Sequence, residues 1–175
     1  MLCILSENVQ DQNILKDGNF ESSRPDGTWP SSGAWSTSWY PEKAGARATY
    51  TAAQNGRCGL WIYTSDGVSF CRPYQEFQCK PLAGYKAEAF LRCPYEGEWT
   101  KGSVAFISIS FIDKSGNVIY TSNSDLLKTG NSLWRLYSVS LIAPQGAVKV
   151  RYSINLESSA GQSILNADNC SLITY

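Results

Sequence analysis

Residues 85–113 read YKAEAFLRCPYEGEWTKGSVAFISISFID, and this stretch decides the fold. Apolar and polar side chains alternate with a period of two over residues 85–93 and again over 104–113, which predicts two strands with unlike faces. The faces expected to enter the core carry Tyr85, Ala87, Ala89, Leu91 and Cys93 in the first strand, and Ala105, Ile107, Ile109 and Phe111 in the second.

The opposite faces mix phenylalanine with polar groups. They carry Lys86, Glu88, Phe90 and Arg92 in the first strand, and Phe106, Ser108 and Ser110 in the second. A sheet face that meets only water has little use for phenylalanine, whereas the apolar C–H face of a sugar ring packs well on an aromatic side chain. We therefore expect Phe90 and Phe106 to look out over one open, ligand-binding surface.

The rest of the chain predicts more short strands and no helix. They are expected at 48–53, 58–64, 73–79, 117–122, 134–144, 148–157 and 164–174, with a hairpin turn at DKSGN (113–117). Nine or ten strands at near-regular spacing favour an all-β fold, a two-sheet antiparallel sandwich of the jelly-roll type. We expect one domain over 1–175 with its core at roughly 13–173.

One segment, residues 23–47, reads as a long loop anchored by tryptophans. It is rich in proline and glycine and contains Trp29, Trp35 and Trp39. We expect Trp39 and one other tryptophan to close the end of the sandwich, since buried aromatics contribute strongly to core stability.

Composition narrows the class of partner. The 175 residues are 43% hydrophobic and only 17% charged, with a net charge of zero and no basic block, which argues against nucleic acid or an anionic membrane. No apolar run is long enough to span a bilayer. The balance suits an extracellular β-protein, although the opening MLCILSENV is too short for a signal peptide, and we expect the protein to be a monomer.

Histidine is absent, and six cysteines are present. The lack of histidine excludes Ser-His-Asp and Cys-His nucleophile systems and histidine-rich metal sites. The cysteines form no CxxC pair, so a zinc ribbon or a thioredoxin-type motif is not expected. They are either disulfide-bonded, with Cys71–Cys93 as the first pair to consider, or buried free thiols in a β-core.

Four stretches, taken in order, resemble carbohydrate-binding modules of families 4, 9, 16 and 22. They are NILKDGNFE at the start, NGRCGLWI, YQEFQCKPLAGYKAEAFLR in the middle and ILNADNCSLI at the end, and together they span roughly 13–173. The resemblance implies a β-jelly roll with a sugar-binding groove on its concave sheet and a structural calcium ion. Cysteines at 58 and 170 depart from the pattern of these families.

The resemblance also implies a calcium site at the meeting point of the first and last strands. Glu21 and Asp168 would supply carboxylates, and the backbone oxygens of Asn19, Arg57 and Asp168 would complete the set. A mixture of carboxylate and carbonyl oxygens is what Ca²⁺ prefers.

The sugar itself would lie on the outward strand faces. Phe90 and Phe106 are the expected platforms, and the further candidates are Glu88, Arg92, Arg151 and Asn155 as polar partners, with Tyr74 and Trp61 extending the platform. The function that this surface favours is a non-catalytic module that binds a polysaccharide of the β-glucan, xylan or mannan type and targets an attached glycoside hydrolase to it. The alternative is a glycan-recognising adhesion or phage-tail module on the same scaffold. Catalysis is not expected, because glycoside hydrolysis requires two carboxylates and only Glu88 is placed on this face.

Overall fold

The computed structural model describes residues 12–23, 33–40 and 44–175. Within these ranges lie ten strands and two short 3-10 helices. The strands are β1 (Ser36–Tyr40), β2 (Gly45–Thr49), β3 (Gly59–Tyr63), β4 (Ser69–Gln78), β5 (Gly84–Arg92), β6 (Val104–Ile112), β7 (Val118–Asn123), β8 (Arg135–Ile142), β9 (Lys149–Ser158) and β10 (Ile164–Thr174). The helices are η1 (Tyr50–Ala52) and η2 (Glu96–Glu98).

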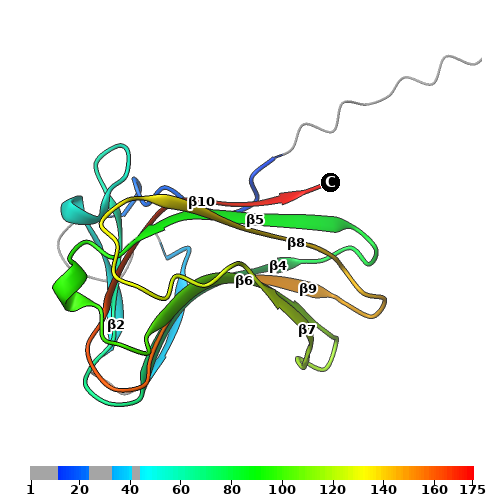
Figure 1. Cartoon of the computed structure of the whole chain (residues 1–175). Helices are drawn as coiled ribbons and strands as arrows, with labels where there is room; N and C mark the ends of the chain where they lie inside the picture. The colour runs from blue at the N-terminus through cyan, green and yellow to red at the C-terminus, as the bar shows by residue number, and fades with distance from the viewer. Residues whose placement is uncertain (1–11, 24–32, 41–43) are drawn as a thin grey trace, which may run out of the picture.

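The strands form two antiparallel sheets of five within the described part of the chain. Sheet A has the order β1-β4-β9-β6-β7, and sheet B has the order β2-β3-β10-β5-β8. The sheets pack as two layers, and sheet A arches so that its hollow side faces away from sheet B (Figure 1). The predicted all-β sandwich is confirmed, and the chain crosses repeatedly from one sheet to the other, as in a jelly roll.

The core lies between the sheets, and the period-two patterns assign it correctly. Tyr85, Ala87, Ala89 and Leu91 point inward from β5, and Ile107, Ile109 and Phe111 point inward from β6; all are buried. The predicted turn between β6 and β7 also forms: Asp113 accepts N–H groups of Ser115 (2.8 Å) and Asn117 (2.9 Å), and Gly116 has a φ of 85°. Local pattern and turn chemistry therefore suffice to set the faces of β5 and β6.

The segment that reads as a long loop contains a strand. β1 pairs with β4, and Trp35 immediately before it is buried at 4% exposure, with its ring 5.4 Å from that of Phe20. Trp39 is 50% exposed, so the expectation that it closes the sandwich is wrong, and Trp29 lies outside the described residues. The run 48–53, expected to be a strand, instead contributes the end of β2 and then η1.

The N-terminal segment is attached to the last strand. Ile14 N donates to Leu172 O (2.8 Å), Cys170 N donates to Gly18 O (2.8 Å), and Asn13 Oδ1 accepts Leu172 N (2.9 Å). These hydrogen bonds join the segment that begins at residue 12 to the last strand, whereas the tie that the resemblance implied runs through a calcium ion. No helix among the described residues has the length and apolarity that crossing a membrane requires.

The five cysteines of the described ranges are free thiols, four of them buried. Cys71 is in β4 of sheet A and Cys93 directly follows β5 of sheet B. They form no disulfide bond, so the expected pairing is wrong. Cys3 lies outside the described residues. Burial raises the pKa of Cys71 and of Cys170 to about 12, which keeps both thiols protonated and unreactive at neutral pH.

Candidate functional site

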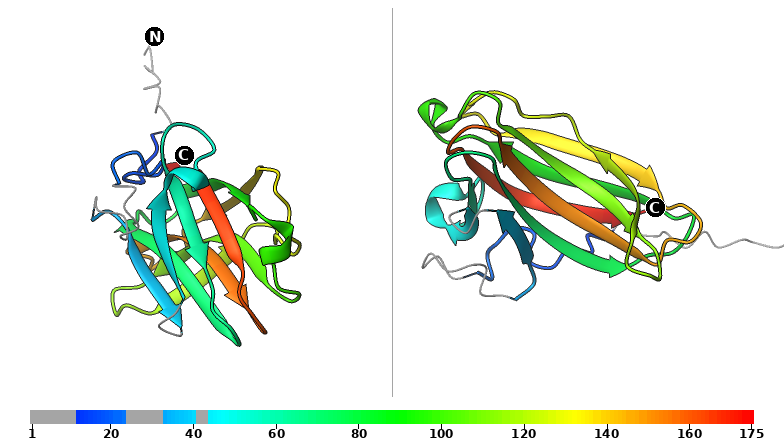
Figure 2. Two further views of the ribbon diagram at one scale, coloured as in Figure 1. Left: turned by 90° about the vertical axis from the view of Figure 1, so that its left-hand side faces the viewer. Right: turned by 90° about the horizontal axis from the view of Figure 1, so that it is seen from below.

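A groove of about 380 Å³ lies on the outer face of sheet A, the hollow side of the arch. All five strands of the sheet contribute to it, and the view from below in Figure 2 looks onto this side, with β9 in orange. Its lining consists of Ser38, Arg72, Tyr74, Phe106, Ser108, Ser110, Thr121, Asn123, Arg151, Ser153, Asn155 and Glu157. Hydroxyl and amide side chains therefore make up most of the surface.

The floor of the groove is a fixed network of small polar groups. The hydroxyls of Ser108 and Ser153 lie 2.7 Å apart, and Asn155 Nδ2 donates to Ser108 Oγ (3.1 Å) and to Phe106 O (3.3 Å). A further pair joins Ser110 and Thr121 at 2.8 Å. No group among the described residues donates to Asn155 Oδ1, so this oxygen is left as an acceptor for a ligand.

Each arginine of the groove is paired with a glutamate. Arg72 pairs with Glu157 at 2.7 Å, and Arg151 pairs with Glu76 at 2.6 Å, while Lys149 also reaches Glu76 at 3.3 Å. Desolvation raises the pKa of Glu76, but hydrogen bonds and charge from Arg151 and Lys149 outweigh it, so the net pKa is lowered. Each guanidinium also lies over an aromatic ring, Arg72 over Phe70 and Arg151 over Tyr74.

Four of the predicted sugar-binding residues meet in this groove. They are Tyr74 on β4, Phe106 on β6, and Arg151 and Asn155 on β9. Sequence reasoning missed Arg72 and Glu157, although a period of two places them on the same face as Tyr74 and Asn155. It also missed Thr121 and Asn123, because nothing in the sequence places β7 beside β6 except the hairpin turn between them.

The other four predicted residues lie elsewhere. Phe90, Glu88 and Arg92 on β5 and Trp61 on β3 all face outward from sheet B. The expectation that Phe90 and Phe106 share one surface is wrong: both point away from the core, but β5 and β6 belong to different sheets, so they point in opposite directions. Glu88 forms an ion pair with Lys86 (2.7 Å) on its own strand.

The residues of the predicted calcium site converge on the loop after η1. Oε1 of Glu21 accepts N–H groups of Arg57 (2.7 Å) and Cys58 (2.8 Å), while Oδ2 of Asp168 accepts those of Gln54 (2.7 Å) and Asn55 (3.2 Å). Asn19 is exposed, and its side chain accepts the N–H of Glu21 (3.4 Å).

The electrostatics of these two carboxylates are relevant to a cation. Burial raises the pKa of Asp168, three N–H donors oppose that rise, and the neighbouring charge of Glu21 adds to it. The chain offers no cluster of three or more acidic, cysteine or histidine side chains in its described part. A Ca²⁺ ion here would depend on Glu21, Asp168 and backbone oxygens, and Oε2 of Glu21 and Oδ1 of Asp168 retain lone pairs for it.

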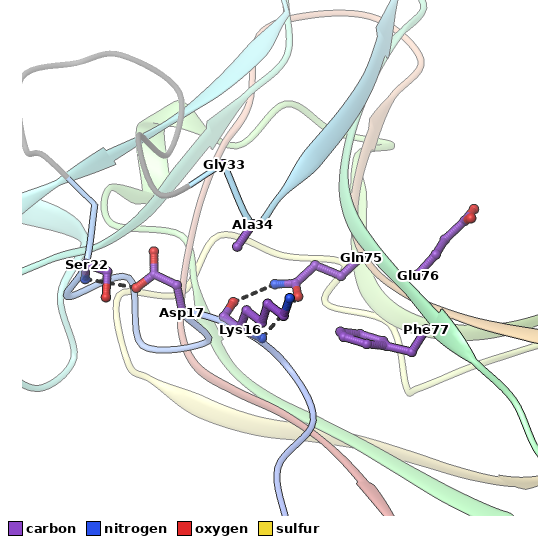
Figure 3. Close-up of a pocket in the computed structure, with 8 residues that line it drawn as sticks. All are labelled: Lys16, Asp17, Ser22, Gly33, Ala34, Gln75, Glu76 and Phe77. Atoms are coloured by element: carbon purple, nitrogen blue, oxygen red, sulfur yellow. Dashed lines mark hydrogen bonds between the residues drawn. The ribbon is translucent and has the colours of Figure 1, made fainter.

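A second hollow of about 620 Å³ lies between residues 16–22 and the inward-facing side of β4 (Figure 3). Two of its polar side chains are already used: Gln75 attaches the N-terminal segment to β4, and Asp17 forms a hydrogen bond within that segment. Gln75 accepts Lys16 N (3.1 Å) and donates to Lys16 O (2.7 Å), and Asp17 accepts Ser22 N (2.9 Å). Its role is therefore to anchor this segment, and the groove on sheet A is the better candidate for ligand binding.

The sequence matches no protein-family model and no curated protein. Solved structures match over nearly the whole chain. One is TmCBM61 in complex with β-1,4-galactotriose, with a TM-score of 0.62 and 18% identity over 92% of this chain and 97% of that one. Another is the CBM22-1 xylan-binding domain of Xyn10C from Paenibacillus barcinonensis, with a TM-score of 0.62 and 12% identity over 90% and 91%.

A third match is to the enzymatically active domain of tailspike protein 4 from bacteriophage CBA120. Its TM-score is 0.66 at 15% identity, over 93% of this chain but only 21% of that one, so the chain spans about a fifth of the tailspike's length. At such low identities the likeness concerns architecture alone. The chain has the two-sheet β-sandwich fold of carbohydrate-binding modules.

Proposed function

We propose that this chain is a non-catalytic carbohydrate-binding module that holds a neutral polysaccharide, of the β-glucan, xylan or mannan type, in the groove of sheet A. The observation that carries the proposal is the composition of the groove. Its hydroxyl and amide groups suit the hydroxyl rim of a sugar chain, and each of its two arginines is paired with a glutamate, so neither arginine is left free to bind an ionic ligand.

Binding in the groove would combine an aromatic surface with fixed hydrogen-bonding groups. Tyr74 and Phe106 supply the apolar contact for a sugar ring, and Asn155 Oδ1 is an acceptor for a hydroxyl. Because the floor is already hydrogen-bonded within the protein, little side-chain entropy is lost when a ligand binds. These features support recognition of a sugar chain.

The carboxylates at the groove, Glu76 and Glu157, argue for a role without catalysis. A glycosidase needs one carboxylic acid that stays protonated near its working pH. Arg151 and Lys149 hold the pKa of Glu76 below its usual value, and Glu157 is bound to Arg72 at 2.7 Å, so both carboxylates are suited to orienting arginine.

Tyr74→Ala tests the groove. Loss of the aromatic surface is expected to weaken binding to the preferred polysaccharide about tenfold, which corresponds to about 1.4 kcal/mol. The measurement is affinity electrophoresis in gels containing xylan, β-glucan or mannan. Tyr95→Ala is the matched control, because Tyr95 is exposed on a loop outside the groove lining.

Two results would count against the groove. One is retention of Tyr74→Ala equal to that of the wild type on a polysaccharide that retards it. The other is failure of every neutral polysaccharide to retard the wild type, which would remove this ligand class.

The alternative role is that of a glycan-recognising module of an adhesin or phage tail. The likeness to the tailspike of bacteriophage CBA120 favours this possibility. The groove would be the same, and only the source of the glycan would differ. A glycan array that carries plant polysaccharides beside bacterial surface glycans separates the two roles.

For the setting of the module we propose an extracellular, monomeric unit fused to a larger protein, such as a glycoside hydrolase. Several matched chains support fusion, since the domain covers only part of their length, including an arabinofuranosidase of which it covers 26%.

We further propose that Glu21 and Asp168, with backbone oxygens of Asn19, Arg57 and Asp168 itself, hold a structural Ca²⁺ ion. A cation would relieve the repulsion between the two carboxylates and tie the N-terminal segment to β10. Removing it with EDTA is expected to lower the melting temperature by several degrees, and added Ca²⁺ should restore it. The measurement is a thermal shift with Glu21→Gln as the control variant, and an EDTA-insensitive wild type would exclude the ion.

A further inference from the structure

The outer face of sheet B carries a row of four residues that extends across four neighbouring strands. Arg47 on β2 lies directly opposite Trp61 on β3. Trp61 in turn lies opposite Asn166 on β10, and Asn166 lies opposite Arg92 on β5. Directly opposed residues of antiparallel strands share a face, so the four side chains lie side by side. At one strand spacing per step the row spans about 14 Å. We call it the arginine row; it lies on the opposite side of the sandwich from the groove.

The two arginines of the row are oriented but not neutralised. The guanidinium of Arg47 lies 4.1 Å from the ring centre of Trp61, and that of Arg92 lies 4.6 Å from the ring centre of Trp134. Neither is in an ion pair with any described residue. Both arginines of the groove, in contrast, are paired with glutamates. The arginine row is therefore a cationic surface, whereas each arginine of the groove is balanced by a glutamate.

The row also contains a buried donor and a buried acceptor without partners in the described structure. Asn166 is 1% exposed, and its Oδ1 accepts no hydrogen bond; Arg92 Nε is likewise buried and donates none. The other ends of both side chains are fixed, since Arg92 Nη2 (3.1 Å) and Asn166 Nδ2 (3.4 Å) both donate to Thr51 O in η1. Unsatisfied buried polar groups are uncommon and call for an explanation.

A hydroxyl group suits both kinds of atom, because it can accept from an N–H such as that of Arg92 Nε and donate to an oxygen such as Asn166 Oδ1. Arg92 is only partly buried, so part of its guanidinium is open to a ligand, whereas its Nε and Asn166 Oδ1 are covered and become accessible only through a local rearrangement. The planar guanidinium fork is in turn suited to a carboxylate, which it binds through two parallel hydrogen bonds. A ligand that carries hydroxyls and carboxylates on an extended frame fits the whole row.

We propose that the arginine row is a second binding site, specific for an acidic oligosaccharide built from uronic acids. Sugar carboxylates bind Arg47 and Arg92, and a ring hydroxyl lies between Arg92 and Asn166. The site goes beyond the proposed function of the groove, because it uses other residues, the other sheet and a ligand of different charge. A module with both sites would attach to a matrix in which neutral and acidic polysaccharides are mixed.

Isothermal titration calorimetry with tetragalacturonate tests the proposal, with cellotetraose as the neutral comparison. The wild type is expected to bind tetragalacturonate, with an affinity that falls as salt is added. Arg92→Gln and Arg47→Gln should each weaken this binding about tenfold or more, and Arg92→Lys should retain part of it, because it keeps the charge but not the fork. Lys114→Gln, which removes one positive charge at the exposed β6–β7 turn, should leave it unchanged, as should the groove variant Tyr74→Ala.

Each contrary outcome overturns the site. If the wild type does not bind tetragalacturonate, acidic oligosaccharides are excluded as ligands. If Lys114→Gln loses as much affinity as the arginine variants, the loss is explained by net charge alone. Loss in Tyr74→Ala instead of Arg47→Gln would place the acidic ligand in the groove. Arg47 is exposed, so Arg47→Gln keeps the test valid even if thermal melting shows that Arg92→Gln unfolds. Failure of neutral polysaccharides to bind would refute the groove proposal and leave this one standing.

Discussion

Asp168→Ala is expected to lower the free energy of unfolding by about 3 kcal/mol, because this side chain is the acceptor for three backbone N–H groups. Gln54 N (2.7 Å) and Asn55 N (3.2 Å) donate to Oδ2, and Asn169 N (2.7 Å) donates to Oδ1. A buried donor that loses its acceptor costs about 1–3 kcal/mol, and we take the lower value for each donor because Asn55 is exposed and Gln54 and Asn169 are only partly buried.

Urea unfolding in the presence of EDTA measures this cost without a contribution from bound metal. Asp168→Asn is the informative control, since it keeps one acceptor oxygen and should lose clearly less stability than Asp168→Ala. A loss below about 1 kcal/mol in Asp168→Ala would mean that water replaces the carboxylate and that the loop after η1 is held by other contacts.

The pH dependence of the metal-free protein gives a second measure of the same residue. Burial raises the pKa of Asp168 above its value in the unfolded chain, so the folded state binds this proton more tightly. The stabilising contribution of the protonated group is therefore complete below the unfolded pKa and is lost as pH rises through the folded pKa. Asp168→Asn should remove this part of the profile.

The strand faces could be predicted from the sequence, but the sheet to which each strand belongs could not. A period of two decides which side chains of β5 point inward, and Tyr85 and Leu91 are buried as expected. Periodicity says nothing about lateral neighbours. The prediction that Phe90 and Phe106 face outward is therefore correct, and the prediction that they share one surface is wrong, because their strands belong to different sheets. In the structure the predicted site is therefore divided: four residues line the groove, and the other four lie on the outer face of sheet B, where Trp61 and Arg92 belong to the arginine row.

Other features escaped prediction because they depend on distant contacts. β1 lies in a stretch rich in proline, glycine and tryptophan, and it exists because β4 offers a partner along its outer edge. Each groove arginine is paired with a glutamate on a neighbouring strand, as Arg72 on β4 is with Glu157 on β9. Such pairs can be predicted only when it is known that β4 and β9 are adjacent. The pairing of Arg47 with Trp61 depends in the same way on the register of β2 and β3.

Gly59→Ala is expected to destabilise the protein by about 3 kcal/mol, because η1 packs directly on this residue at the start of β3. A Cβ atom at position 59 would collide with the carbonyl of Ala52 and lie 2.9 Å from Ala53 N, all of them backbone atoms that no side-chain rotation can move. Overpacking of this kind typically costs about 1–3 kcal/mol, and we expect the upper end because backbone must shift. Gly97→Ala is the matched control, since the added methyl group meets nothing within 4 Å.

The same substitution connects the fold to the second surface. Moving η1 away from β3 withdraws Thr51 O, the acceptor that fixes the ends of Arg92 and Asn166. If Gly59→Ala still folds at low temperature, tetragalacturonate binding should fall while binding in the groove of sheet A persists, because η1 contributes nothing to the groove. Urea unfolding and calorimetry on Gly59→Ala and Gly97→Ala measure both effects. Equal stability of the two variants would show that η1 is not closely packed against β3, and the arginine row would then lack its fixed support.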